Sequence, residues 1–220
     1  TISWRLQPSE VKYIVKDCEA KALITSKFLE ETVVNLNASL EGVEKLMLDG
    51  TAEGYQSYED AIESMPIVSV EDECQGGSML YSSGTTGKPK GVKRELTLDP
   101  LPYSEEDEDT ALSRALMIYA GSEESIYLSP APLYHAAPLT FNSAFLAAGA
   151  TSVILEKFDE ESALKAIEDF KVTHSQWVPT MFVRFLKMDP SIKSKYDLSS
   201  HQVAIHAAAP CPVAVKEQMI

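Results

Sequence analysis

The sequence predicts an α/β protein built mainly from parallel strands flanked by helices. Short runs rich in β-branched residues alternate with amphipathic helical runs along the whole chain. Hydrophobic residues make up 45% of the 220 positions and charged residues 24%, values typical of a soluble globular protein. A chain of this length can bury a core in one large domain or two small ones.

The first half of the chain is expected to begin with a helix capped by Ser9, because apolar residues after it recur at helical spacing. Residues 22–25 and 45–48 are short apolar runs and are predicted to be strands. Residues 28–36 and 58–64 are predicted to be helices. The sequence contains no internal repeat.

The second half repeats the same alternation. The predicted strands are residues 78–81, 125–129, 152–155, 174–178 and 203–206. The predicted helices are residues 139–148, 159–170 and 180–187. Strands that alternate with helices in this way are typical of parallel sheets.

The charge balance excludes general nucleic-acid binding. The chain carries 19 Lys and Arg against 33 Asp and Glu, a formal net charge of -14, and such a surface repels a phosphate backbone. Pro138, Asn142, Ser143 and Gly149 interrupt the most apolar stretch, residues 136–155. This stretch therefore predicts a buried helix leading into a strand rather than an integral membrane segment.

The cysteines and one acidic segment carry little functional signal. Cys18, Cys74 and Cys211 are far apart and lack the spacing of metal ligands, which indicates reduced thiols and a cytoplasmic protein without a protein-bound metal. Residues 98–110 are rich in proline and acid, a composition that predicts a flexible, solvated loop.

The two ends predict an internal piece of a longer protein. The chain opens with Thr1 rather than Met, and its last residues, 213–220, follow a helical pattern without a glycine stop signal.

The segment from Ser82 to Gly91 has the chemistry of a phosphate-binding loop. Glycines allow backbone N–H groups to approach an anion, hydroxyl groups donate hydrogen bonds, and lysines add positive charge. The residues concerned are Ser82, Ser83, Gly84, Thr85, Thr86, Gly87, Lys88, Lys90 and Gly91. A plain flexible connection is the alternative, but it would not require two lysines around a proline.

A Walker A loop does not fit this segment. Gly84 and Gly87 are separated by two residues rather than four, and Lys88 is followed by Pro89 instead of serine or threonine. A GTPase or an ordinary P-loop ATPase is therefore excluded.

The sequence Ser82-Ser-Gly-Thr-Thr-Gly-Lys-Pro-Lys-Gly91 resembles the signature loop of the AMP-forming adenylating superfamily, which includes acyl-CoA synthetases, luciferases and peptide-synthetase adenylation domains. The resemblance implies that residues 1–220 are an incomplete N-terminal, AMP-binding domain without the C-terminal domain. It assigns the ATP phosphates to Ser82 through Thr86 and to Lys90, with Gly87 and Lys88 completing the loop. It also implies Mg²⁺ as the balancing cation and CoA as co-substrate.

Two further segments extend the resemblance. Pro132-Leu-Tyr-His135 is similar to a family element beside the acyl pocket, which implies a substrate-site role for His135 other than general base. Taken alone, a single histidine there is more often a packing or capping residue. The run Ala207, Ala208, Ala209 is similar to the turn that packs on adenine, with alanine where glycine is usual; tight strand-to-helix packing explains it equally well.

The resemblance implies an acyl-CoA synthetase that converts a carboxylic acid to acyl-AMP and then transfers it to CoA. An apolar wall expected from Leu139, Phe141, Val178 and Met181 favours a fatty or aryl acid. Because later motifs of the family are missing, the chain alone is expected to be inactive. Transfer to a carrier protein and a non-catalytic nucleotide-binding remnant stay open as alternatives, as does the oligomeric state.

Overall fold

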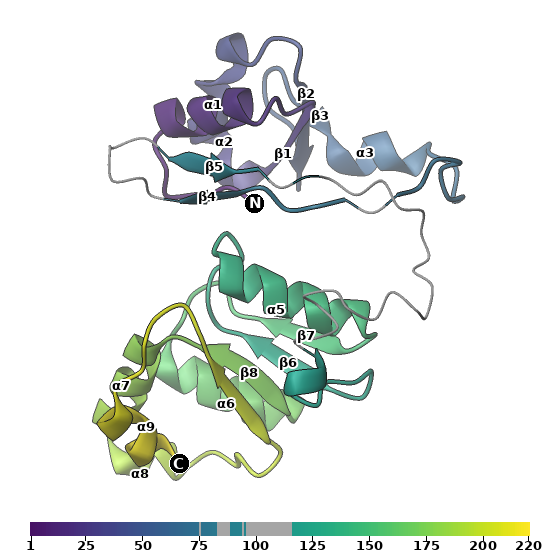
Figure 1. The fold of residues 1–220 in the computed structure, drawn as a ribbon. Coiled ribbons are helices and arrows are strands. Elements are labelled where there is room, and N and C mark those ends of the chain that lie inside the picture. The colour runs from purple at the N-terminus through teal and green to yellow at the C-terminus, as the bar shows by residue number, and fades with distance from the viewer. Residues whose placement is uncertain (75, 83–88, 94, 96–115) are drawn as a thin grey trace. The chain divides into compact units, whose positions relative to one another are not determined.

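A computed structural model of the chain describes residues 1–74, 76–82, 89–93, 95 and 116–220. It divides into two compact units, Ile2–Tyr103 and Ser104–Ile220, with Thr1 grouped with the second. Figure 1 shows the elements of both units by label. The predicted acidic loop at residues 98–110 lies outside the described residues.

The first unit contains a parallel three-stranded sheet in the order β1-β2-β3. Its strands are β1 (Ala22–Ser26), β2 (Glu44–Leu48) and β3 (Gln56–Ser57). Helix α1 (Pro8–Asp17) packs through Val11 and Val15 on one core cluster of this unit. The sequence anticipated the first two strands, whereas β3, with two residues, carries too short a pattern to detect.

Helix α1 begins before the predicted cap, so the assignment of Ser9 as N-cap is wrong. The N-cap is Gln7, whose backbone N–H donates to Glu10 Oε2 at 2.8 Å. Pro8 occupies the first helical position, where its fixed φ favours the helix and its missing N–H costs nothing. Ser9 therefore lies within the first turn.

The remaining helices of this unit are short. They are η1 (Lys27–Leu29), α2 (Glu30–Val34), η2 (Asn37–Ser39) and α3 (Tyr58–Glu63). The single helix predicted for residues 28–36 is instead divided into η1 and α2, with the boundary between Leu29 and Glu30.

A two-stranded antiparallel hairpin also belongs to the first unit. It pairs β4 (Leu80–Ser82) with β5 (Lys90–Val92), and Ser82 lies opposite Lys90 in the register. The hydroxyl of Tyr81 donates to Asp17 Oδ2 at 2.7 Å, which ties the hairpin to the end of α1. The two ends of the Gly-rich sequence are therefore held side by side by backbone pairing.

The second unit is built on a parallel four-stranded sheet in the order β7-β6-β8-β9. The strands are β6 (Ile126–Ser129), β7 (Thr151–Ile154), β8 (His174–Trp177) and β9 (Val203–His206). All four were anticipated to within a residue or two, and the α/β class with parallel sheets is confirmed.

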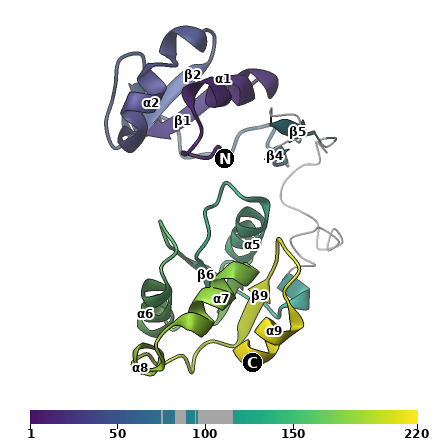
Figure 2. The ribbon, with the colours of Figure 1, turned by 90° about the vertical axis from the view of Figure 1, so that its left-hand side faces the viewer.

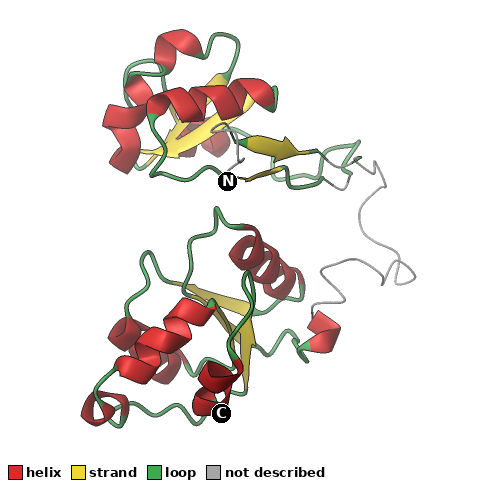
Figure 3. Ribbon diagram, turned by 60° about the vertical axis from the view of Figure 1, so that its left-hand side comes forward, coloured by secondary structure: helices red, strands yellow, loops and turns green. Residues whose placement is uncertain are grey.

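Helices cover both faces of this sheet (Figures 2 and 3). Helix α5 (Ala136–Ala147) packs on one face, and α6 (Glu160–Phe170) and α7 (Pro179–Lys187) pack on the other. Right-handed crossovers require this division, since the chain moves from β6 to β7 in one direction and then to β8 and β9 in the other. The short helices α8 (Pro190–Lys193) and α9 (Val213–Met219) complete the unit.

Two core clusters fill the two faces of the sheet. The α5 face holds Tyr127, Phe145, Ala150 and Ile205, and the rings of Tyr127 and Phe145 stack at 4.5 Å between centroids. The opposite face holds the larger cluster, whose buried members are Leu128, Ala131, Ala163, Leu164, Ala166, Ile167, Val172, Trp177, Met181, Phe182 and Phe185. Among the described residues, no helix is long and apolar enough to cross a membrane.

Candidate functional site

The strand order of the second unit defines a switch point between β6 and β8. From β6 the chain passes outward to β7, and then returns to the other side of β6 to form β8 and β9. In open parallel sheets, ligands bind beyond the carboxyl ends of the strands at such a point. Here these ends are Ser129 in β6 and Trp177 in β8.

His135 lies at this edge of the sheet. It follows β6 by six residues and is the N-cap of α5, where its carbonyl accepts a hydrogen bond from the Leu139 N–H at 3.1 Å. Its ring makes no capping hydrogen bond, is exposed, and lies 4.7 Å from the Tyr134 ring. The backbone of His135 therefore has the capping role, while its imidazole is available at the surface.

The alanine run follows β9 at the same edge. The N–H of Ala207 donates to the Trp177 carbonyl at 3.1 Å, which continues the pairing of β8 with β9 by one residue. Ala208 then adopts φ 71°, in the left-handed region that favours glycine. The structure thus brings His135 and the alanine turn to one edge of one sheet.

The predicted phosphate-binding residues lie in the first unit. Ser82 ends β4 and Lys90 begins β5, with the Lys90 side chain exposed. Ser83, Gly84, Thr85, Thr86, Gly87 and Lys88 lie outside the described residues. For the described part, antiparallel pairing brings the start and the end of the predicted loop together.

The apolar wall expected from four residues is divided by the sheet. Phe141 packs against the cluster under α5, whereas Met181 and Val178 belong to the cluster on the opposite face. Sequence spacing could not show this, because the face of the sheet that α5 or α7 covers depends on the order of the strands that each helix connects.

Sequence reasoning missed three buried polar residues near the switch point. Ser129 and Gln176 are fully buried and Asn142 is 5% exposed. The signal was present, because a parallel strand covered on both faces normally reads as a continuous apolar run, and His-Ser-Gln at the start of β8 does not.

A buried histidine, His174, and a half-buried one, His201, support this sheet. His174 Nε2 lies 3.0 Å from the Tyr119 carbonyl, and His201 Nε2 lies 2.7 Å from the Ser175 hydroxyl. Burial lowers the pKa of His174, although the Tyr119 carbonyl opposes this effect. Burial, together with the charge of His174, also lowers the pKa of His201. Both imidazoles are therefore neutral structural groups near pH 7, and Ser175, being fully buried, is not an accessible nucleophile.

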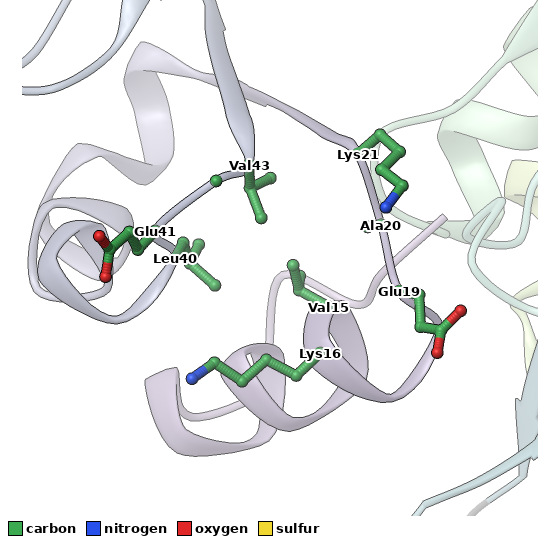
Figure 4. A pocket seen from close by; sticks show the side chains of 9 residues that line it. Val15, Lys16, Glu19, Ala20, Lys21, Leu40, Glu41 and Val43 are labelled. Carbon is green, nitrogen blue, oxygen red and sulfur yellow. The ribbon is translucent and has the colours of Figure 1, made fainter.

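The first unit contains a cavity of about 420 Å³ at the edge of its sheet where the strands begin. Figure 4 shows Val15, Leu40 and Val43 pointing toward one another, with charged side chains such as Lys16 and Glu41 around them. The cavity lies at the amino ends of β1 and β2, where parallel sheets rarely bind ligands. We assign it no site.

The second unit is a doubly wound parallel α/β sheet with polar residues at its switch point, an arrangement that many nucleotide-binding proteins share. The family model described as AMP-binding enzyme matches residues 1–220. The chain therefore belongs to the AMP-binding enzyme family, as the resemblance of the Gly-rich segment predicted.

Two relatives and one solved structure illustrate the similarity. The 4-hydroxybutyrate–CoA ligase 2 of Metallosphaera sedula is 26% identical, with 98% of this chain and 40% of that protein covered. The long-chain-fatty-acid–CoA ligase of Thermus thermophilus is 31% identical, with 83% of this chain and 33% of that protein covered. This chain thus spans less than half the length of either.

The solved structure is the N-terminal domain of FACL13 from Mycobacterium tuberculosis. It superposes with a TM-score of 0.75 at 25% identity, with 98% of this chain and 52% of that chain covered. The fold of this chain therefore matches the N-terminal domain of acyl-CoA ligases.

Proposed function

We propose that this chain forms part of an enzyme that activates a carboxylic acid with ATP and transfers the acyl group to CoA. The observation that carries the proposal is the match of the AMP-binding enzyme family over residues 1–220, which includes the Ser82–Gly91 segment. Fatty and aryl acids are the proposed substrates, since acids of the first kind are named for a relative and the core beside α5 is rich in aromatic side chains.

The proposed reaction has two steps. An oxygen of the carboxylate attacks the α-phosphorus of ATP, the bond to the β-phosphate oxygen breaks, and acyl-AMP and pyrophosphate form. The thiolate of CoA then attacks the acyl carbon, and AMP leaves with the bonding electrons. Negative charge grows on the pyrophosphate in the first step, so a cation held near it stabilises the transition state.

Lys90 is proposed to supply this charge. It is exposed at the start of β5, opposite Ser82 at the end of β4, and therefore adjoins the predicted loop, so its ammonium group can contact a phosphate bound by the loop. Mg²⁺ is proposed as a second source of charge. No group of three His, Cys, Asp or Glu that could hold a metal occurs among the described residues.

The residues at the carboxyl edge of the second unit's sheet are proposed to bind substrate without transferring a proton. The exposed backbone around Ala208 can pack against a planar base, because alanine adds little bulk above the turn. His135 is proposed to contact the acid or the pantetheine arm of CoA rather than to transfer a proton. A cytoplasmic location remains a prediction from the three free thiols.

The test is acid-dependent exchange of pyrophosphate into ATP, measured on this chain and on the natural protein that contains it. We expect exchange in the natural protein with a fatty or aryl acid, and none in the chain of 220 residues alone. Lys90→Glu should lower exchange at least a hundredfold, since reversal of a charge at a phosphate costs several kcal/mol. Lys93→Glu, three residues further on and exposed, is the matched control and should retain exchange. Equal exchange in both variants would refute the role of Lys90.

A further inference from the structure

The hairpin of β4 and β5 needs support from the rest of the first unit. A two-stranded hairpin on its own is at best marginally stable in water. Lys90, which is proposed to place positive charge at the pyrophosphate, is the first residue of β5. The position of its ammonium group therefore depends on the contacts that hold the two strands in place. Helix α1 supplies one such contact.

Helix α1 is a rigid support for the hairpin. Val11 and Val15 are buried and pack with Leu36 and Leu40 in one core cluster of the unit. Asp17 is the last residue of the helix, two residues after Val15. Its carboxylate is therefore attached to backbone that the core holds in place.

The helix itself does not explain the carboxylate of Asp17. The carboxyl end of a helix carries partial negative charge, so an acidic side chain is unfavourable there. The carboxylate instead accepts a hydrogen bond from the Tyr81 hydroxyl at 2.7 Å. The hydroxyl of Tyr13, one turn earlier in α1, also hydrogen-bonds to it. Two phenol hydroxyls thus gather on one carboxylate, one from the helix and one from the hairpin.

The ring of Tyr81 lies over Gly91 in the partner strand. The two residues are register partners, so they share one face of the hairpin. A Cβ atom at Gly91 would lie 3.0 Å from Tyr81 Cζ and 3.1 Å from its hydroxyl oxygen, and it would also meet Met79 Cε. These separations are shorter than ordinary van der Waals contact. Glycine at position 91 therefore leaves the space that the tip of the Tyr81 ring occupies.

Lys90 belongs to the other face of the hairpin. Neighbouring residues of a strand point to opposite faces, so the exposed side chain of Lys90 points away from the Tyr81 ring. One face of the hairpin is thus attached to α1, and the other presents the ammonium group. Gly91, where the ring rests, is the residue next to Lys90. A shift of the ring therefore changes the position of the Lys90 backbone directly.

The hydrogen bond between Tyr81 and Asp17 is of the stronger kind. Burial raises the pKa of Tyr81, and the hydrogen bond to Asp17 and the charge of that carboxylate raise it further. The hydroxyl is therefore a donor at neutral pH, and a hydrogen bond to an ionised acceptor is stronger than one between neutral groups. Such a contact can hold a strand where catalysis needs a fixed charge.

We propose that Asp17 and Tyr81 are positioning residues for the adenylation step. The Asp17 carboxylate holds the Tyr81 ring against Gly91, and this contact keeps Lys90 where its ammonium group meets the leaving pyrophosphate. Neither residue contacts the substrate itself. The inference rests on the proposed function and adds to it a dependence of the phosphate contact on helix α1.

The test uses acid-dependent pyrophosphate exchange on the natural protein. Tyr81→Phe keeps the ring and removes the hydroxyl. We expect kcat to fall about tenfold with little change in KM for ATP, since the lost contact acts on the transition state. Asp17→Leu, which removes the acceptor at similar size, should give a similar loss. Asp17→Asn keeps an acceptor oxygen and should retain most of the activity.

Tyr196→Phe is the matched control. The Tyr196 hydroxyl donates to Glu161 Oε1, also at 2.7 Å, and both residues belong to the second unit. The substitution therefore removes the same kind of contact without touching the hairpin, and exchange should stay unchanged. Thermal unfolding checks that each variant is folded, and the pair Asp17→Leu and Asp17→Asn carries the comparison where Tyr81→Phe is unfolded.

A double variant separates positioning of Lys90 from a general loss of structure. If the Tyr81 hydroxyl acts through Lys90, then adding Tyr81→Phe to Lys90→Ala should lower exchange by less than about twofold. A further loss of about tenfold in the double variant would mean that the two residues act independently, and would overturn the inference. An unchanged kcat in Tyr81→Phe, or an equal loss in Tyr196→Phe, would overturn it as well.

The outcomes also separate this inference from the proposed function. Exchange in the natural protein that Tyr81→Phe does not affect would refute the role of Asp17 and Tyr81 alone. Absence of exchange with every acid in the unsubstituted natural protein would refute the proposed function and this inference with it.

Discussion

At the residue scale, Ala208 adopts a backbone conformation that costs free energy. Its φ of 71° lies where an L-residue with a Cβ is strained by about 1 kcal/mol relative to glycine. The strain occurs in the turn at the carboxyl end of β9, the segment proposed to contact a planar base. A position of this kind is maintained where the surrounding structure, or a ligand, requires the turn.

Ala208→Gly should therefore stabilise the chain by up to about 1 kcal/mol in chemical denaturation, since glycine adopts this φ without strain. Ala209→Gly is the matched control. Ala209 has no positive φ, so there glycine should destabilise by about 0.5–1 kcal/mol through greater freedom of the unfolded chain. An equal change in the free energy of unfolding for both substitutions would show that backbone strain at Ala208 is not the cause.

His174 and His201 predict a pH dependence of stability. In the unfolded chain they titrate near pH 6.5, and in the folded chain burial lowers the pKa of both His174 and His201. The unfolded state therefore binds more protons as the pH falls below about 6.5. This contribution to stability is complete above that pH and is lost as the pH falls toward the folded pKa values.

We expect a lower free energy of unfolding at pH 5 than at pH 7.5, measured in urea. His201→Gln, which can still hydrogen-bond to Ser175, should make this dependence weaker. An unchanged slope between pH 5 and 7.5 in this variant would show that His201 does not contribute. The acidic groups whose pKa is lowered, such as Asp159 and Glu160, contribute stability that is complete above about pH 4.5 and is lost only below it, so they do not cause the difference between pH 5 and 7.5.

At the element scale, the start of helix α6 is stabilised by one contact local in sequence and one from helix α7. Asp159 Oδ1 accepts the Ser162 N–H at 2.9 Å as the N-cap. Arg184 of α7 makes two hydrogen bonds of 2.6 Å to Glu160 in the first turn. The buried residues Ala163, Leu164, Ala166 and Ile167 then continue the helix along the sheet.

Asp159→Ala should destabilise the second unit by about 1 kcal/mol, because it leaves a first-turn N–H without its acceptor. Asp169→Ala is the control, since it removes only an exposed ion pair with Lys165 in the last turn and should cost less. Both are measured by the midpoint of chemical unfolding. A larger loss in the control would be inconsistent with the capping argument.

Helices and strands were predicted correctly where the periodic pattern of apolar residues is long. They were missed where the element spans only two or three residues. Residues 203–206 form β9 as predicted, and α6 follows the Asp159 cap and an apolar helical period. Strands β3 and β5, with two and three residues, have no periodicity to detect, and each exists because a neighbouring strand supplies its hydrogen bonds. Helix α5 begins at Ala136, before the predicted start, since Pro138 falls where the helix needs no N–H.

At the scale of the whole chain, the core is divided between the two units. The clusters around Val11 and around Met47 belong to the first unit, and those around Leu128 and around Tyr127 belong to the second. No residue is shared between the clusters of different units, among the part of the chain that the structure describes. Each unit therefore has a hydrophobic core of its own.

A chain of residues 104–220 alone should fold cooperatively, with its own thermal transition followed by circular dichroism. The complete chain should then show two transitions, or one that is broader than a single two-state unit predicts. Residues 104–220 with Phe182→Ala serve as a control that should lose stability by about 3–5 kcal/mol. A piece without a cooperative transition would show that the units depend on each other.

The sequence by itself determined the α/β class, most element positions and the family, because these depend on local periodicity and on a run of residues between Ser82 and Gly91. It also identified His135 and the alanine turn as candidates. The tertiary structure was needed to show that these two meet at one sheet edge, that Phe141 and Met181 lie on opposite faces, and that Gln176 is fully buried with its Nε2 donating to the Trp177 carbonyl. Strand order and register join residues that are far apart in the chain, and no local pattern specifies which strands become neighbours.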